Sequence, residues 1–197
     1  QFHLYDAEGS GELRRLCACA GIDYRNSSKH IKIHKRENAS TEHMFQEFKK
    51  VCDHKENNPE YYKDEVVLGN NKRVERYLPT IWMIDSISSL TPKELQEKVQ
   101  KKGKVDRMYA ADKARTNNNH IEQMENLATK YNIMVFIVQH ETKDIDTNPF
   151  KTREKRAHSA DVKSTGGSKA LFESDLQMRI DRIVSANRDR VNKDYLK

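Results

Sequence analysis

Two short, nearly unbroken apolar runs constrain the fold of this chain more than any other feature. They are TIWMID, which ends at Asp85, and IMVFIVQ, which ends at Gln139. Such runs are typical of strands in a parallel sheet, because helices cover both faces of that sheet and leave few positions for polar side chains. Between them, residues 107–131 carry apolar side chains at helical spacing, which predicts a crossover helix. The sequence therefore predicts an α/β fold with a mostly parallel central sheet flanked by helices.

Strands and helices alternate along the rest of the chain as well. FHLY and HIKIHK are predicted strands, and GELRRLCACA and MFQEFKKVC are predicted helices. Gly21 favours the left-handed conformation that ends a helix, and the hydroxyls of Ser40 and Thr41 can cap the helix that follows them. Residues 56–79 are predicted to hold an inserted hairpin, since EVVL and RVERY flank the turn residues GNN. A short helix and the strand DLQMRI are expected after Gly167.

The composition predicts one soluble globular domain. The chain has 197 residues, of which 36% are hydrophobic and 34% charged, and this length allows a sizeable core. It has no apolar run approaching the roughly 20 residues that span a bilayer, and it does not open with a basic leader, so neither membrane insertion nor secretion is expected. Three cysteines are too few for a full disulfide framework, which favours a reducing cytoplasm.

Two further features of the composition bear on possible ligands. A zinc site built from Cys17, Cys19, His30 and His34 stays open as an alternative, although the C-x-C spacing is unusual for zinc. The formal net charge of +6 favours a polyanion as partner, because lysine and arginine side chains that meet phosphates release condensed counterions.

Polar side chains follow three of the predicted strands at the point where each strand ends. LYDAE ends in Asp6 and Glu8, IWMIDS in Asp85 and Ser86, and FIVQH in Gln139 and His140. The carboxyl ends of parallel strands share one edge of a sheet, which is where ligands bind. An aspartate directly after an apolar strand is suited to holding Mg²⁺. The alternatives are that Asp85 starts a turn or caps the next helix, and that the other residues are ordinary polar strand ends.

Four motifs occur in an order that resembles the core of RecA-family recombinases, most closely their phage UvsX-like branch. They are LYDAEGS, IWMIDSISSLTPKE, IMVFIVQHETK and STGGSKALFESDLQMRI, and together they extend over most of the chain. The resemblance implies a RecA-like P-loop NTPase core, with ATP and Mg²⁺ as cofactors. Its order of elements is more specific than any single motif.

The resemblance also implies roles for the residues at the strand ends. Glu8 corresponds to the general base that orients and activates the attacking water, and Asp85 to the Walker B carboxylate that holds magnesium. Gln139 and His140 correspond to sensors of the γ-phosphate, and Ser86 is grouped with them as nucleotide-binding. Lys169 is expected to act across the interface between neighbouring subunits of a filament.

Two DNA-binding loops are implied at residues 96–107 and 141–165. The first carries the basic residues Lys98, Lys101, Lys102, Lys104 and Arg107. The second carries Lys143, Lys151, Arg153, Lys155, Arg156 and Lys163, and Gly166 and Gly167 follow it. Basic side chains in such loops can track a phosphate backbone. The first segment can equally be the solvated end of a helix, and acidic residues dilute the charge of the second.

The function that the resemblance implies is an ATP-dependent recombinase. Such a protein forms filaments on single-stranded DNA and promotes pairing and strand exchange with homologous double-stranded DNA, in the cytoplasm or nucleoid of a bacterial host. No G-x-x-x-x-G-K-[S/T] phosphate loop occurs in the chain. We therefore expect a core truncated at its N-terminus, and at its C-terminus as well. The alternatives are a non-catalytic RecA-like DNA-binding paralogue and a RecA-like replicative helicase.

Overall fold

The computed structural model describes residues 1–35, 39–102, 109–143, 162–164 and 174–178. Within these ranges, four parallel strands form a central sheet in the order β2-β1-β5-β6. Their bounds are β1 Phe2–Asp6, β2 Ile31–Lys35, β5 Thr80–Asp85 and β6 Ile133–Ile137. The predicted α/β class with a parallel sheet is confirmed.

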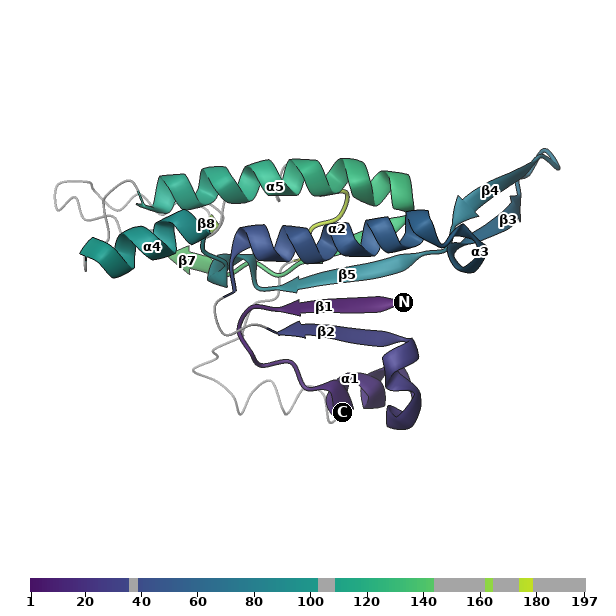
Figure 1. Cartoon of the computed structure of the whole chain (residues 1–197), viewed down its shortest axis with the longest axis horizontal. Coiled ribbons are helices and arrows are strands. Elements are labelled where there is room, and N and C mark those ends of the chain that lie inside the picture. The colour runs from purple at the N-terminus through teal and green to yellow at the C-terminus, as the bar shows by residue number, and fades with distance from the viewer. Residues whose placement is uncertain (36–38, 103–108, 144–161, 165–173, 179–197) are drawn as a thin grey trace, which may run out of the picture.

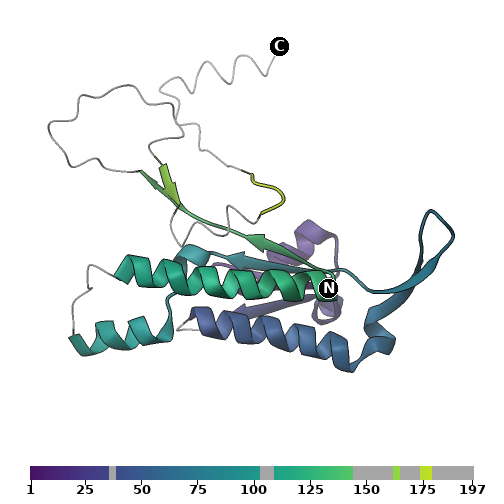
Figure 2. The same cartoon turned by 90° about the horizontal axis from the view of Figure 1, so that it is seen from above.

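Helices cover both sides of the sheet. α2 (Thr41–Asn57) and α5 (Tyr109–Tyr131) lie side by side on one face, and α1 (Leu13–Ala20) lies on the opposite side of the strands (Figures 1 and 2). This placement follows from the strand order, because the crossovers from β1 to β2 and from β5 to β6 run in opposite directions across the sheet. Right-handed crossovers that run in opposite directions place their helices on opposite faces.

The residues that were predicted to end α1 and to cap α2 lie at the ends of these helices. Gly21, directly after α1, has a φ of 66° and adopts the left-handed conformation that glycine tolerates without a steric penalty. Ser40 precedes α2, and its Oγ accepts a hydrogen bond from the backbone N–H of His43 at 3.1 Å. The predicted cap by Ser40 is confirmed. Thr41 begins the helix instead, and its hydroxyl donates to Oδ1 of Asn117 on α5 at 2.7 Å.

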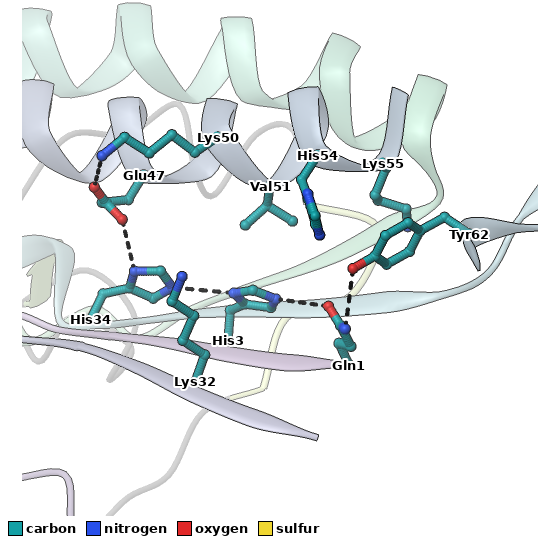
Figure 3. A pocket seen from close by; sticks show the side chains of 10 residues that line it. All are labelled: Gln1, His3, Lys32, His34, Glu47, Lys50, Val51, His54, Lys55 and Tyr62. Atoms are coloured by element: carbon teal, nitrogen blue, oxygen red, sulfur yellow. Dashed lines mark hydrogen bonds and ion pairs between the residues drawn. The ribbon is translucent and has the colours of Figure 1, made fainter. Parts of the chain in front are cut away.

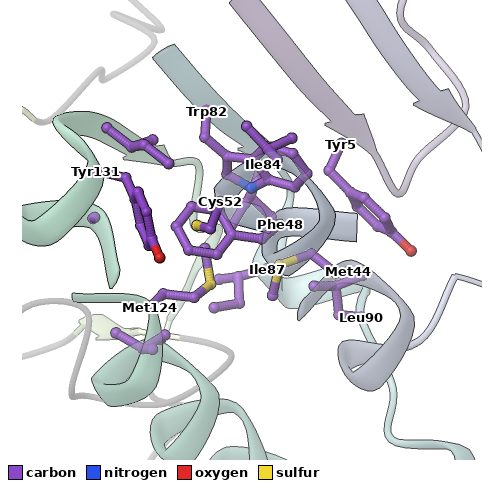
Figure 4. Packing of buried hydrophobic residues seen from close by; sticks show 14 residues of the cluster. Tyr5, Met44, Phe48, Cys52, Trp82, Ile84, Ile87, Leu90, Met124 and Tyr131 are labelled. Atoms are coloured by element: carbon purple, nitrogen blue, oxygen red, sulfur yellow. The ribbon is translucent and has the colours of Figure 1, made fainter. Parts of the chain in front are cut away.

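The main core lies between the sheet and the α2–α5 layer (Figure 4). Trp82 of β5 is fully buried at its centre, and its ring meets the ring of Phe48 edge-on at a centroid distance of 5.3 Å. Met124 and Tyr131 of α5 close the layer from the other side. Each buried side chain of this size contributes about 1.5–3 kcal/mol through its removal from water.

A hairpin extends away from this core, as predicted for residues 56–79. After the short helix α3 (Pro59–Tyr62), β3 (Lys63–Val67) pairs antiparallel with β4 (Arg73–Tyr77), and the pair projects at one end of the molecule (Figures 1 and 2). All five residues of β3 are exposed. The fold assigns no function to this hairpin.

Two segments differ from their sequence-based interpretation as DNA-binding loops. Residues 96–102 belong to helix α4 (Lys93–Lys102), because KELQEKVQKK is rich in strong helix formers and pairs glutamate with lysine four residues on. In the second segment, β7 (Glu141–Lys143) pairs antiparallel with β8 (Val162–Ser164), so the described ends of this segment form a short hairpin stem. Residues 103–107, 144–161 and 165 lie outside the described residues.

The strand expected in DLQMRI is absent from its described part, and this prediction is wrong there. Residues 174–178 form no ladder with any described strand, and Leu176 and Met178 are 75% and 74% exposed. Alternating apolar residues form a strand only where a neighbouring edge accepts their backbone hydrogen bonds.

Two 3₁₀ turns, η1 (Tyr24–Lys29) and η2 (Ile87–Ser89), complete the description, and η2 directly follows β5. None of the helices within the described ranges combines the length and the apolar character needed to cross a membrane.

Candidate functional site

The candidate site lies where β1, β5 and β6 end side by side. Asp6 is paired with Asp85, and Ile84 with Ile137. The ladder continues past the strand ends, because the N–H of Ala7 donates to the carbonyl of Asp85 at 2.7 Å and the N–H of Ile87 to that of Val138 at 3.0 Å. The polar residues that follow the three strands therefore meet at one edge of the sheet.

Glu8 is the centre of this meeting point. Within the described part of the chain, three side chains contact its Oε1: Ser86 Oγ at 2.6 Å, Ser89 Oγ at 2.9 Å and His140 Nε2 at 2.8 Å. A carboxylate only accepts hydrogen bonds, so His140 must carry its proton on Nε2. The hydrogen bond from Ser86 lowers the pKa of Glu8 most, followed by those from His140 and Ser89, to about 2. Glu8 is consequently ionised at physiological pH.

The pKa of Asp85 is shifted in the opposite direction, above its ordinary value. Burial raises its pKa first, and the negative charges of Glu8 and Asp6 raise it further. The Asp6 carboxylate is occupied within its own turn, since it accepts hydrogen bonds from the backbone N–H groups of Ser10 at 3.1 Å and Gly11 at 2.8 Å. Among the described residues, the Asp85 carboxylate has no hydrogen-bond partner. It is therefore the acidic group at this edge that is available to a ligand.

Asp85 could serve as the one protein carboxylate of a magnesium site. Mg²⁺ in proteins is usually held by one or two carboxylates, with water and phosphate oxygens as its other ligands. A cation next to Asp85 would also offset the repulsion that Glu8 and Asp6 exert on it. Among the described residues, no three His, Cys, Asp or Glu side chains form a group that could hold a metal without such additional ligands.

The absence of such a group among the described residues also rules out the zinc site considered from the sequence. Cys17, Cys19, His30 and His34 all lie in the described ranges and do not gather into a metal site. His34 uses both ring nitrogens elsewhere, with Nε2 3.1 Å from Nδ1 of His3 and Nδ1 3.0 Å from Oε2 of Glu47.

The arrangement also differs from that of a serine hydrolase. In a catalytic triad the histidine lies between the serine and the acid, so that it can take the proton of the serine. Here Glu8 lies between Ser86 and His140, with both bonded to the same oxygen. No serine of this cluster is positioned for activation by the histidine.

Two contributors were missed by sequence reasoning. Ser89 lies three residues after Ser86, and its Oγ is 3.1 Å from the Ser86 Oγ. Lys113 of α5 donates from Nζ to the carbonyl of Ser88 at 2.6 Å and ties that helix to η2. The only sequence signal for Ser89 is the S-x-x-S spacing after the strand, and no sequence signal marks Lys113.

The remaining predicted residues fall into four groups. Gln139 follows β6 and is half-buried next to His140, whose backbone N–H donates to Ser88 Oγ at 3.0 Å. Lys98 and Lys101 are exposed on α4, with Nζ 2.7 Å and 4.0 Å from carboxylate oxygens of Glu94 and Glu97. Only the backbone is described for Lys102, Lys143 and Lys163. Outside the described residues lie Lys104, Arg107, Lys151, Arg153, Lys155, Arg156, Gly166, Gly167 and Lys169.

A second polar cluster lies between α2 and the strands β1 and β2. There a cavity of about 280 Å³ is lined by His3, His34 and Glu47 together with Lys50, Lys55 and Tyr62 (Figure 3). Burial lowers the pKa of both histidines, that of His3 to about 4. Of these residues, sequence reasoning singled out His34 alone, as a ligand in the zinc alternative.

No protein-family model matches the chain, and no curated protein matches it either.

Proposed function

We propose that this chain is a RecA-like ATPase core that hydrolyses ATP with Mg²⁺ and acts in DNA recombination and repair. The observation that carries the proposal is the convergence of Glu8, Asp85 and His140 at the carboxyl edge of one parallel sheet. This edge is where α/β proteins bind nucleotides. Each residue comes from the end of a different strand, in the order that the resemblance to RecA-family proteins predicts.

Asp85 and Glu8 have different roles in the proposed reaction. Asp85 would hold the magnesium ion, which neutralises charge that develops on the phosphates. Glu8 would position the attacking water, since its carboxylate lies at the same edge and stays ionised. His140 and Gln139 would contact the terminal phosphate, because an imidazole N–H or an amide that donates to a carboxylate can donate to a phosphate oxygen as well.

DNA is the proposed partner of the segments that follow this edge. β7 begins at Glu141, directly after His140, so a movement of His140 on phosphate binding would act on the base of segment 141–165. The net charge of +6 favours a polyanion, and Lys98 and Lys101 on α4 are exposed to solvent. We extend the proposal to filaments on single-stranded DNA, pairing with homologous double-stranded DNA and a location in the cytoplasm or nucleoid of a bacterial host.

The test is DNA-stimulated ATP hydrolysis by the longest natural form of the chain. Glu8→Gln and Asp85→Asn should each lower the rate by about 100-fold or more, as expected for loss of a group that acts on the reacting atoms. Glu65→Gln is the matched control, because Glu65 is an exposed carboxylate on the projecting hairpin. Hydrolysis that survives Glu8→Gln would remove Glu8 from its role, and the absence of any ATP hydrolysis would end the proposal.

A non-catalytic DNA-binding paralogue is the second candidate. The observation that favours it is the lack of a G-x-x-x-x-G-K-[S/T] motif in these 197 residues. Single-stranded DNA binding that is tight, salt-dependent and indifferent to ATP would support this candidate over the first. Steady strand separation without pairing would instead indicate a RecA-like helicase.

A further inference from the structure

The hydrogen bonds to Glu8 saturate one oxygen of its carboxylate. A carboxylate oxygen has two lone pairs, yet within the described part of the chain Oε1 accepts from Ser86, Ser89 and His140. A glutamate that serves only to bind water would not need three protein donors. The negative charge of Glu8 is therefore compensated by hydrogen bonds from the protein.

The three donors differ in how readily they can leave. Ser86 is fully buried, and its segment is held to β6 by the backbone bond between Ile87 and Val138. His140 is exposed, with 57% of its side chain accessible, and it lies between the end of β6 and β7. Ser86 is thus a fixed donor, whereas His140 is a donor that can turn toward a ligand.

The residue that follows Glu8 is a glycine in the left-handed conformation. Gly9 has a φ of 74°, and apart from its two chain neighbours no atom of the described residues lies within 4 Å of the position that a Cβ would take there. Gly9 adopts this left-handed conformation without strain. The space beside Gly9, directly after Glu8, is therefore open among the described residues.

An entering phosphoryl group would compete with Glu8 for these donors. Its oxygens are strong acceptors of hydrogen bonds from an imidazole N–H and a hydroxyl, and its charge repels a neighbouring carboxylate. We propose that Ser86, Ser89 and His140 hold Glu8 in a resting state, and that a bound phosphoryl group takes over His140 and Ser89 and so releases Glu8 to bind water. The inference rests on the proposed function and deepens it, because it assigns the regulation of the same site.

The exchange ties the strength of Glu8 as a proton acceptor to the ligand. With three donors in place the pKa of Glu8 is about 2, and a carboxylate with so low a pKa is a weak base at neutral pH. Loss of two donors moves its pKa back toward the usual range for glutamate. Glu8 is then a competent base only when a phosphoryl group is present.

The experiment measures the pKa of the Glu8 carboxyl by NMR of ¹³C-labelled protein, with Glu8→Gln to assign the signal. Ser89→Ala should raise the pKa of Glu8 toward its ordinary value, and Ser10→Ala, which changes an exposed serine of the same turn, should leave it in place. Saturating magnesium tripolyphosphate should raise the pKa of Glu8 in the wild-type protein, and should raise it less in His140→Gln. Amide spectra of each variant check that it is folded.

The outcomes separate this inference from the proposed function. An unchanged Glu8 pKa in folded Ser89→Ala, or in wild-type protein with tripolyphosphate present, would overturn the resting state even if ATP is hydrolysed. A raised Glu8 pKa in both conditions supports it even if the chain hydrolyses no ATP, in which case the proposed catalytic function alone fails. Binding of tripolyphosphate away from Glu8, detected as no change at Glu8 and shifts elsewhere, also overturns it.

Discussion

Acid should weaken the fold through His3, and the size of the effect follows from where that side chain lies. His3 is 6% exposed and is stacked against His34 and Trp82 at centroid distances of 5.4 Å and 5.7 Å. Because Glu47 accepts the Nδ1 proton of His34, the Nε2 of a neutral His34 accepts from Nδ1 of His3. In a neutral His3 the Nε2, which lies 3.4 Å from Oε1 of Gln1, then carries no proton. A further proton on His3 has to enter this buried network.

Every interaction that shifts the pKa of His3 lowers it. Burial lowers its pKa most, and the charges of His34, Lys32, the α-amine of Gln1 and Lys55 lower it further, from 6.5 to about 4. The unfolded chain binds the proton near 6.5 and the folded chain only near 4, so the stabilisation is fully present above pH 6.5 and is lost as the pH falls toward 4. The loss between those limits is about 3 kcal/mol, at about 1.4 kcal/mol for each pKa unit.

Urea denaturation from pH 7 to pH 4 tests this reasoning. The free energy of unfolding of wild type minus that of His3→Gln should fall by about 3 kcal/mol over this range, because glutamine takes up no proton. His30→Gln is the matched control, since His30 is an exposed histidine next to β2. Other titrating groups are common to wild type and variant and largely cancel in the difference. A difference that stays constant between pH 7 and pH 4 would refute the reasoning.

Three other changes have expected outcomes. Lys55 is 1% exposed, its Nζ donates to Leu78 O and Thr80 Oγ1, and burial lowers its pKa from 10.5 to about 8. The free energy of unfolding of wild type relative to Lys55→Met should therefore rise by about 3 kcal/mol as the pH increases from 8 to 10.5. Equal pH profiles of the two proteins in urea melts would contradict this. Asp85→Asn removes a carboxylate that Glu8 and Asp6 repel, so thermal melting at pH 7 without Mg²⁺ should occur at a higher temperature than in wild type, and any stabilisation by Mg²⁺ should disappear. Ser40→Ala removes the cap of α2 and should lower the free energy of unfolding by about 1 kcal/mol, measured by the fluorescence of Trp82, with Ser10→Ala expected to change it far less.

The sequence was enough to predict that polar residues gather at the carboxyl edge of the sheet, because this prediction needs only the positions at which the strands end. Apolar runs that end in Asp85 and Gln139 identify strands of a parallel sheet, and all strands of such a sheet end on the same side. The spacing of polar residues after each strand then brings Glu8, Ser86 and His140 together. Their direct contact also requires that β1, β5 and β6 be neighbours in the sheet, which the sequence does not state.

The rest depends on contacts that no local pattern contains. The pairing of His3 with His34 requires that β1 and β2 be neighbours in one register, which the sequence does not state. The helix over residues 96–102 was interpreted as loop because the resemblance was given more weight than the helix propensity of KELQEKVQKK. The expected strand at residues 174–178 shows the reverse error, since alternation predicts a strand only where an edge is available.

β1 connects the two polar clusters, because it contains His3 and leads directly into the turn that carries Glu8. Its residues Phe2–Asp6 are paired with β2 on one side and with β5 on the other, residue for residue. A slip by one residue would turn Leu4 and Tyr5 to the wrong faces of the sheet, so the register is fixed by burial along the whole strand. The ladder therefore places the start of the turn that carries Glu8 beside Asp85, and the hydrogen bonds from Ser86 and His140 then position the Glu8 carboxylate. His3→Gln should accordingly weaken the fold while leaving the pKa of Glu8 at about 2, and a shift at Glu8 in that variant would mean that β1 transmits changes from one end of the sheet to the other.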